Sequence, residues 1–134
     1  MKEFKKTALI AAEKAGKILI KNLGKVKQID YKGIVNLVTE IDRLSEKTII
    51  DTILKRFPNH EILAEESKEK YNSSEYKWII DPLDGTTNYA HGYPVVCISI
   101  ALEIEGEIAM GIVYDPFRDE LFYAEKGKGA YLNN

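Results

Sequence analysis

The chain has 134 residues, of which 45% are hydrophobic and 30% charged, the composition of one ordinary globular domain and not of a disordered chain. Its 19 Lys and Arg oppose 21 Asp and Glu, and neither sign forms a long block, so we expect no nucleic-acid partner. No apolar run approaches the roughly 18 residues that span a bilayer, so we expect no membrane partner. The single cysteine, Cys97, fits a reducing cytoplasm.

Apolar residues at helical spacing predict two helices in the first part of the chain. The first covers about residues 3–23, has a face of small alanines and stops at Gly24. The alanine face predicts close packing on a sheet. The second helix covers about residues 40–57, because Thr39 and Asp42 have capping-box spacing at its start and Pro58 follows its end.

The rest of the chain has short apolar runs bounded by turn residues, which predict strands. The predicted strands cover residues 61–64, 78–80, 95–104, 108–114 and 120–124. Glu105 and Gly106 predict a tight hairpin, residues 67–77 a polar loop, and residues 127–129 a turn. Two helices followed by a meander predict an α+β fold, with both helices packed on one face of a mainly antiparallel sheet.

The segment at residues 78–88, WIIDPLDGTTN, is the most informative about chemistry. An apolar strand delivers Asp81 at its end, and a sharp turn lets the carboxylates of Asp81 and Asp84 face one point. Oxygen ligands of this kind suit Mg²⁺ or Mn²⁺, and the carbonyl of Leu83 is available as a further ligand. The residues from Thr86 onward can open a short helix whose free N–H groups hold an anion such as phosphate.

Each acidic group also has a purely structural interpretation. The segment at residues 81–85 can be an Asx-type turn between two elements. Glu65 and Glu66 end another apolar run, so they either bring further acids to the same rim or form a solvated edge. Asp42 closes the capping box, reaches the site, or does both. Three other side chains are predicted to have no chemical role. His60 is predicted to lie at the surface and His91 in a loop. Cys97 is predicted to pack as a small apolar residue in a strand.

Three stretches occur in an order that resembles the inositol monophosphatase family. They are NLVTEID at residues 36–42, AEES at 64–67, and the segment from 78 to 94. The resemblance runs from about residue 30 to 134, and DPLDGTTN is its most specific part. It implies a Mg²⁺-dependent, lithium-sensitive phosphatase that hydrolyses a phosphate monoester of inositol or a related sugar, without a covalent intermediate. It also implies a homodimer or another homo-oligomer.

The resemblance implies metal ligands at four positions. Glu65 and Asp81 bind an activating Mg²⁺ together with the carbonyl oxygen of Leu83. Asp81 and Asp84 bind a second Mg²⁺ near the leaving oxygen. The metals neutralise the charge of the phosphate and lower the pKa of bound water toward neutrality.

The resemblance also implies residues that hold the phosphate and the water. The backbone N–H groups of Gly85 and Thr86 bind the phosphate. Asp42 and Thr86 polarise the nucleophilic water, and Glu66 holds water or metal-bound ligands from further out.

The resemblance leaves three functions open besides an inositol monophosphatase. Fructose-1,6-bisphosphatases and phosphatases of 3'-phosphoadenosine 5'-phosphate share the motif. Family members are roughly twice this length, so we expect residues 1–134 to form the N-terminal domain of the layered αβαβα sugar-phosphatase fold, with the C-terminal domain absent from the chain. The third alternative is a metal-binding or assembly module without turnover, whose exposed sheet favours homo-oligomers.

Overall fold

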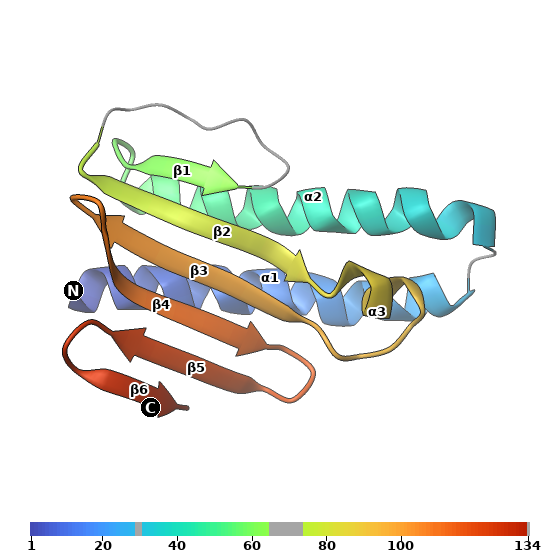
Figure 1. Cartoon of the computed structure of the whole chain (residues 1–134). Helices are drawn as coiled ribbons and strands as arrows, with labels where there is room; N and C mark the ends of the chain where they lie inside the picture. The colour runs from blue at the N-terminus through green and yellow to red at the C-terminus, as the bar shows by residue number, and fades with distance from the viewer. Residues whose placement is uncertain (29–30, 65–73, 134) are drawn as a thin grey trace.

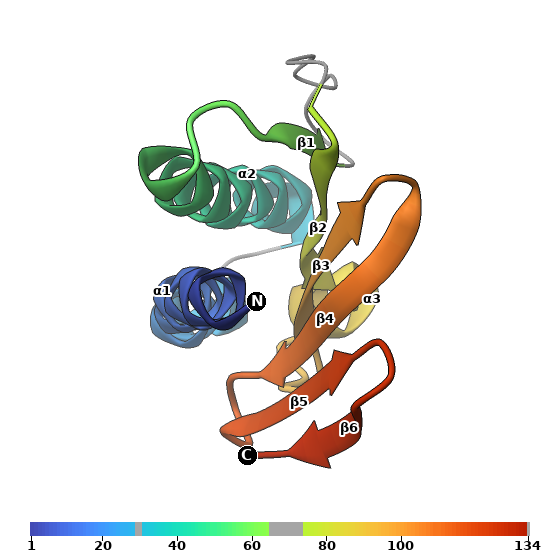
Figure 2. The ribbon, with the colours of Figure 1, turned by 90° about the vertical axis from the view of Figure 1, so that its left-hand side faces the viewer.

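The computed structural model describes residues 1–28, 31–64 and 74–133. Two long helices lie side by side on one face of a six-stranded sheet, and Figure 2, which looks along the helices, shows that they leave the other face open. A third, short helix lies beyond the end of β2 (Figure 1). The elements are α1 (Lys2–Gln28), α2 (Tyr31–Arg56), β1 (Glu61–Ala64), β2 (Tyr76–Asp84), α3 (Thr86–Ala90), β3 (Cys97–Ile104), β4 (Glu107–Asp115), β5 (Glu120–Glu125) and β6 (Gly129–Leu132). The predicted α+β fold class is confirmed.

Both long helices extend beyond the predicted bounds. α1 continues past Gly24 because Val26, in its last turn, is buried, and one exposed glycine costs a helix only about 1 kcal/mol. The capping box predicted at Thr39 is wrong, since α2 already begins at Tyr31. Thr39 lies inside the helix, where its hydroxyl donates to the carbonyl of Val35 at 2.9 Å.

α1 packs against α2 and against β3 and β4 of the sheet, and its alanine face is buried. Gly16 marks the closest approach: a Cβ added there would lie 2.7 Å from Cε2 of Tyr114 and 3.0 Å from Cβ of Pro116. The small residues that bring the helix close to the sheet are fully or almost fully buried: Ala8, Ala11, Ala12 and Ala15. Within the described part of the chain, no helix is both long and apolar enough to cross a membrane.

The sheet follows the order of the chain from β1 to β6. β1 pairs with β2 in parallel, with Ala64 opposite Ile80, and every later pair is antiparallel. The predicted hairpin between β3 and β4 is confirmed, and both of its turn residues, Glu105 and Gly106, have positive φ. β6 was not predicted, because all four of its residues are exposed and they carry no alternating apolar pattern.

An aromatic cluster packs around the start of β2. It consists of Phe4, Phe57, His60, Tyr76 and Trp78. The ring of His60 stacks on Phe57 and on Tyr76, each at 4.7 Å, and its Nδ1 accepts the indole N–H of Trp78 at 3.0 Å. His60 lies in the loop before β1 and is partly exposed, as predicted, but its ring is packed in this cluster. Burial lowers the pKa of its imidazole.

Candidate active site

Asp81 and Asp84 lie at the end of β2, where its pairing with β3 is irregular. Asp81 is opposite Ser99 and Asp84 is opposite Cys97, with a register shift between them. Residues three apart in a regular strand point to opposite faces, and a register shift removes that constraint. The sequence analysis predicted that this strand ends before Asp81. In the structure β2 continues to Asp84 and carries both acids in its irregular final part. Oδ1 of Asp81 lies 3.4 Å from the backbone N of Leu83 and accepts its N–H.

The charges of these two aspartates act on one point, the thiol of Cys97. Its Sγ donates to Oδ2 of Asp84 at 3.7 Å. Burial, the largest cause, acts together with the hydrogen bond to Asp84 and the charges of Asp84, Asp81 and Asp115 to raise the pKa of Cys97 to about 11. Three carboxylates thus create a negative potential at this end of the sheet. Cys97 is half-buried at the start of β3, so it is not the apolar packing residue that the sequence predicted.

Asp115 was not among the candidate site residues; followed by Pro116, it is typical of the start of a turn. It ends β4, and its Oδ1 accepts the N–H groups of Phe117 and Arg118, both at 3.1 Å. This is the geometry of a turn-forming aspartate. Its charge contributes to the potential near Cys97, but its hydrogen bonds serve the turn.

The short helix predicted after Asp84 is confirmed as α3. Gly85 precedes it with φ +102°, and a Cβ there would lie only 3.1 Å from the carbonyl oxygen of Val95. Glycine is therefore needed for the sharp change of direction from β2 into α3. The fully buried Tyr89 fixes α3 on α1, because its hydroxyl donates to the carbonyl of Leu19 at 2.7 Å. The first residue of α3, Thr86, follows Asp84 and Gly85 directly.

α2 contributes Asp42 and a contact that the sequence analysis missed. Asp42 is half-buried, and its Oδ1 is shielded from solvent. One turn later, the fully buried Ser45 donates its hydroxyl to the carbonyl of Pro82 at 2.9 Å. The available signal was a serine between Ile41 and Ile49, at the spacing of the buried stripe of the helix. This bond joins the helix that carries Asp42 to the strand that carries Asp81 and Asp84.

The predicted ligand Glu65 and its neighbour Glu66 lie outside the described residues. The structure describes β1 as far as Ala64, which pairs with Ile80, the residue before Asp81. Within residues 1–28, 31–64 and 74–133, no three His, Cys, Asp or Glu side chains form a group that could hold a metal ion. The donors present here, two carboxylates and the carbonyl of Leu83, are hard oxygen atoms that fit Mg²⁺ or Mn²⁺.

Two comparisons with known proteins bear on this arrangement. The sequence profile of the inositol monophosphatase family matches residues 1–134. The chain belongs to the inositol monophosphatase family. Inositol monophosphatase 3 of Solanum lycopersicum is 44% identical over 137 residues, which are 99% of this chain and 51% of that protein. The fructose-1,6-bisphosphatase/inositol-1-monophosphatase of Aquifex aeolicus is 44% identical over 135 residues, 99% of this chain and 51% of that protein.

Solved structures of family members have the same fold. The inositol monophosphatase from Anabaena (Nostoc) sp. PCC 7120 superposes with a TM-score of 0.83 at 44% identity, covering 99% of this chain and 48% of that one. The suhB protein from Bartonella henselae gives 0.88 at 40% identity, with 98% and 52% covered. The chain therefore spans about half the length of the family members it matches.

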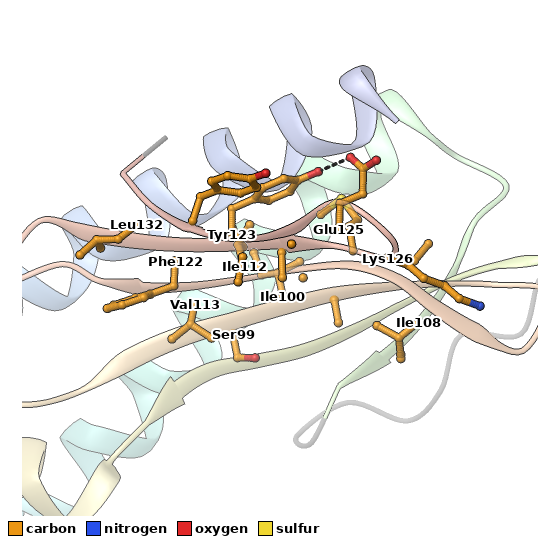
Figure 3. A pocket seen from close by; sticks show the side chains of 18 of the residues that line it. Ser99, Ile100, Ile108, Ile112, Val113, Phe122, Tyr123, Glu125, Lys126 and Leu132 are labelled. Atoms are coloured by element: carbon orange, nitrogen blue, oxygen red, sulfur yellow. Dashed lines mark hydrogen bonds between the residues drawn. The ribbon is translucent and has the colours of Figure 1, made fainter.

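The open face of the sheet is a second candidate surface. A shallow groove lies over β3 to β6, and Figure 3 shows the side chains that line it. Four large apolar side chains on this face are exposed: Ile108, Val113, Phe122 and Leu132. Such a surface buries apolar groups against a partner. The groove is lined by neither Asp81 nor Asp84, which lie at the end of β2, so catalysis is better assigned to that end.

Proposed function

We propose that this chain supplies the metal-binding half of a Mg²⁺-dependent phosphatase that hydrolyses a phosphate monoester of inositol or a related sugar. The observation that carries the proposal is the placement of Asp81 and Asp84 in the irregular end of β2, joined by Ser45 to the helix that carries Asp42. Family membership supports the same reaction class. A staphylococcal relative, 38% identical to this chain, has been solved as "inositol monophosphate bound", which supports an inositol phosphate as substrate.

Electrostatics supports the need for a cation. A phosphate monoester is an anion, and the charges of Asp81, Asp84 and Asp115 already raise the pKa of the Cys97 thiol. An anion approaching this end of the sheet meets unfavourable potential unless a divalent cation lies between the two. A bound Mg²⁺ or Mn²⁺ supplies that charge, and it lowers the pKa of a coordinated water.

The proposed roles of the individual residues are those that the family resemblance implies, and for the described residues the positions above support them. Asp81, Asp84 and the carbonyl of Leu83 would hold the metal, together with Glu65. The backbone N–H groups of Gly85 and Thr86, where β2 turns into α3, would bind the phosphate oxygens.

The water would be held from the helix side of the site. The carboxylate of Asp42 would accept a hydrogen bond from the attacking water, with the hydroxyl of Thr86 as its partner. Glu66 would orient further water around the metal. General-base assistance of this kind needs a carboxylate within hydrogen-bond reach of the water in the substrate complex.

A second activity is favoured by one relative. The Aquifex aeolicus protein is named for both fructose-1,6-bisphosphatase and inositol-1-monophosphatase, so a sugar bisphosphate is the first alternative substrate. A phosphatase of 3'-phosphoadenosine 5'-phosphate is the second, and a staphylococcal relative solved as "2'AMP bound" makes nucleotides worth testing. The exposed side chains over β3 to β6 support the remaining alternative, an assembly module without turnover of its own.

We also propose a homodimer or another homo-oligomer in the cytoplasm. The exposed Ile108 and Phe122 on the open sheet face support association, and the single cysteine suits a reducing compartment. Light scattering of the purified chain at several concentrations measures its oligomeric state. A mass that stays monomeric would refute this part of the proposal.

The catalytic proposal is tested by phosphate release. The chain would be assayed with Mg²⁺ on inositol 1-phosphate, fructose 1,6-bisphosphate and 3'-phosphoadenosine 5'-phosphate, alone and after co-expression with the remaining half of the Aquifex aeolicus relative. Removal of the metal with EDTA is the control. We expect release from inositol 1-phosphate in the co-expressed sample and its loss with EDTA. Turnover that persists without metal would contradict the mechanism. Metal binding without turnover in either sample would favour the module.

A further inference from the structure

The hydrogen bond from Ser45 to Pro82 lies where the sheet itself provides the least support. Pairing between β2 and β3 is described at Asp81 and resumes at Asp84, so Pro82 lies in the shifted part of the ladder. Proline has no N–H, and its carbonyl is its one backbone hydrogen-bonding group. A buried carbonyl without a partner is costly. Ser45 provides that partner from α2, 37 residues away in the chain.

Other hydroxyl groups of α2 form a different kind of bond. In the described part of this helix, Thr39, Thr48 and Thr52 each donate to a carbonyl four residues earlier, at 2.7 to 2.9 Å. These bonds stay within the helix and fix nothing outside it. The hydroxyl of Ser45 instead crosses to another element, and it is fully buried.

The Ser45 bond fixes two halves of the proposed site relative to each other. Asp42 precedes Ser45 by three residues, so the two lie on the same side of α2. Pro82 lies between Asp81 and Leu83, both proposed ligands. A shift of α2 against the end of β2 would therefore move the proposed water-binding carboxylate away from the proposed metal ligands, and the Ser45 bond resists that shift.

We propose that Ser45 is a positioning residue of the metal site, and that its hydroxyl holds the Asp81–Asp84 turn in the conformation that binds Mg²⁺. This inference rests on the proposed function, since it assumes that Asp81 and Asp84 are the ligands. Ser45 itself touches neither metal nor substrate. Partners that orient metal ligands from outside contribute about tenfold to a hundredfold in metal affinity.

The test compares Ser45→Ala with a matched variant, Tyr89→Phe. Each removes one buried hydroxyl that donates to a carbonyl of another element, but Tyr89 joins α3 to α1 and not α2 to β2. Calorimetric titration of the full chain with Mn²⁺ measures metal affinity, and thermal unfolding shows that each variant folds. We expect Ser45→Ala to lower the Mn²⁺ affinity by about tenfold or more, Tyr89→Phe to leave it near that of the unchanged chain, and Ser45→Thr to restore most of it.

A second measurement needs no metal. Amide hydrogen exchange at Leu83 and Asp84 in the metal-free chain reports whether the turn is held. We expect exchange there to be faster in Ser45→Ala and unchanged in Tyr89→Phe. Equal Mn²⁺ affinity in Ser45→Ala and the unchanged chain would overturn the proposal, as would unchanged exchange at both amides. If the unchanged chain binds no Mn²⁺, the proposed function fails, and the exchange data alone then decide whether Ser45 holds the turn.

Discussion

The two ends of strand β2 are stabilised in different ways. At its start, Tyr76 and Trp78 pack in the aromatic cluster, where rings from α1 and from the segment between α2 and β1 surround a fully buried indole. At its other end, the strand loses regular pairing and carries Asp81 and Asp84. The first end is held by packing, whereas the second is held by single hydrogen bonds from other elements, such as that of Ser45.

The difference separates stability from function along one strand. Aromatic packing stabilises the fold by burying apolar area. The indole N–H of the cluster also forms a hydrogen bond, to His60. The other end carries two aspartates in an irregular part of the strand, which a hydrogen bond from α2 helps to hold. We therefore expect substitutions at the first end to change the free energy of unfolding, and substitutions at the second end to change metal binding.

The largest expected effect is at the aromatic end. Trp78→Ala removes a fully buried indole, so we expect the free energy of unfolding to fall by about 3–5 kcal/mol. Urea unfolding followed by circular dichroism measures the loss. Trp78→Phe is the matched control, because it keeps a buried aromatic ring while it removes the N–H that His60 accepts and part of the indole volume. A loss below about 1 kcal/mol for Trp78→Ala would mean that the cluster does not carry the stability of this end.

Asp81→Asn tests the other end. We expect Mn²⁺ affinity to fall by about a hundredfold or more and metal-dependent phosphate release to disappear, because the variant removes a charged ligand. The metal-free variant should keep the stability of the unchanged chain, since asparagine keeps the oxygen that accepts the N–H of Leu83.

The matched control for Asp81→Asn is Asp119→Asn. Asp119 is also an acid that accepts a hydrogen bond, from the hydroxyl of Tyr114 at 2.9 Å, but it lies in the turn between β4 and β5. Its substitution should leave Mn²⁺ affinity unchanged. If Asp81→Asn retained full metal binding, Asp81 would be a turn residue only.

Gly85→Ala changes the backbone where β2 turns into α3. Its φ of +102° disfavours any side chain, and the added Cβ would lie 3.1 Å from the carbonyl of Val95. We expect a loss of about 1–3 kcal/mol in the free energy of unfolding. Gly106→Ala, also at positive φ but with open space around it, should cost less. Equal losses for the two variants would show that the crowding near Val95 is unimportant.

The smallest effect concerns pH and the histidine of the aromatic cluster. Burial lowers the pKa of His60 below its usual 6.5, so in the folded chain the imidazole binds a proton less readily than in the unfolded chain. Stability should therefore decrease as pH falls below about 6.5 and level off below the folded pKa. A protonated Nδ1 could no longer accept the indole N–H of Trp78.

Fluorescence of Trp78, the single tryptophan, measures this pH dependence during urea unfolding. The decrease between pH 7 and pH 5 should disappear in His60→Phe and persist in His91→Asn, a substitution of the exposed second histidine. An identical pH dependence in His60→Phe and the unchanged chain would contradict the assignment.

Periodicity in the sequence was sufficient to predict the helices, the first five strands and the fold class. The start of α2 was not predictable from Thr39, because a threonine at capping-box spacing has the same local sequence whether it caps a helix or bonds within it. The environment of His60 depends on rings that lie far from it in the sequence, such as Phe4. Spacing alone does not reveal such contacts.

The part of the candidate site that lies in one continuous segment, residues 81–86, could be predicted from the sequence. The spacing of Asp81, Asp84 and Gly85 indicated a turn with two converging acids; the structure places both acids in the irregular end of β2, followed by Gly85 at positive φ, and the convergence of the carboxylates stays a prediction. Ser45 was missed, because its partner Pro82 lies 37 residues away and a buried serine in a helix has several ordinary explanations. The predicted roles of Asp42 and Thr86 stay predictions until metal and substrate binding are measured.

The sequential order of the strands has a consequence for how the chain folds. From β2 to β6, neighbours in the sheet are neighbours in the sequence, except for the passage through α3, so these pairs close short loops. The docking of α2 on β2 joins more distant segments, and the bond between Ser45 and Pro82 forms only with that docking. We expect the meander to form early and the geometry around Asp81 and Asp84 to be completed among the last steps of folding.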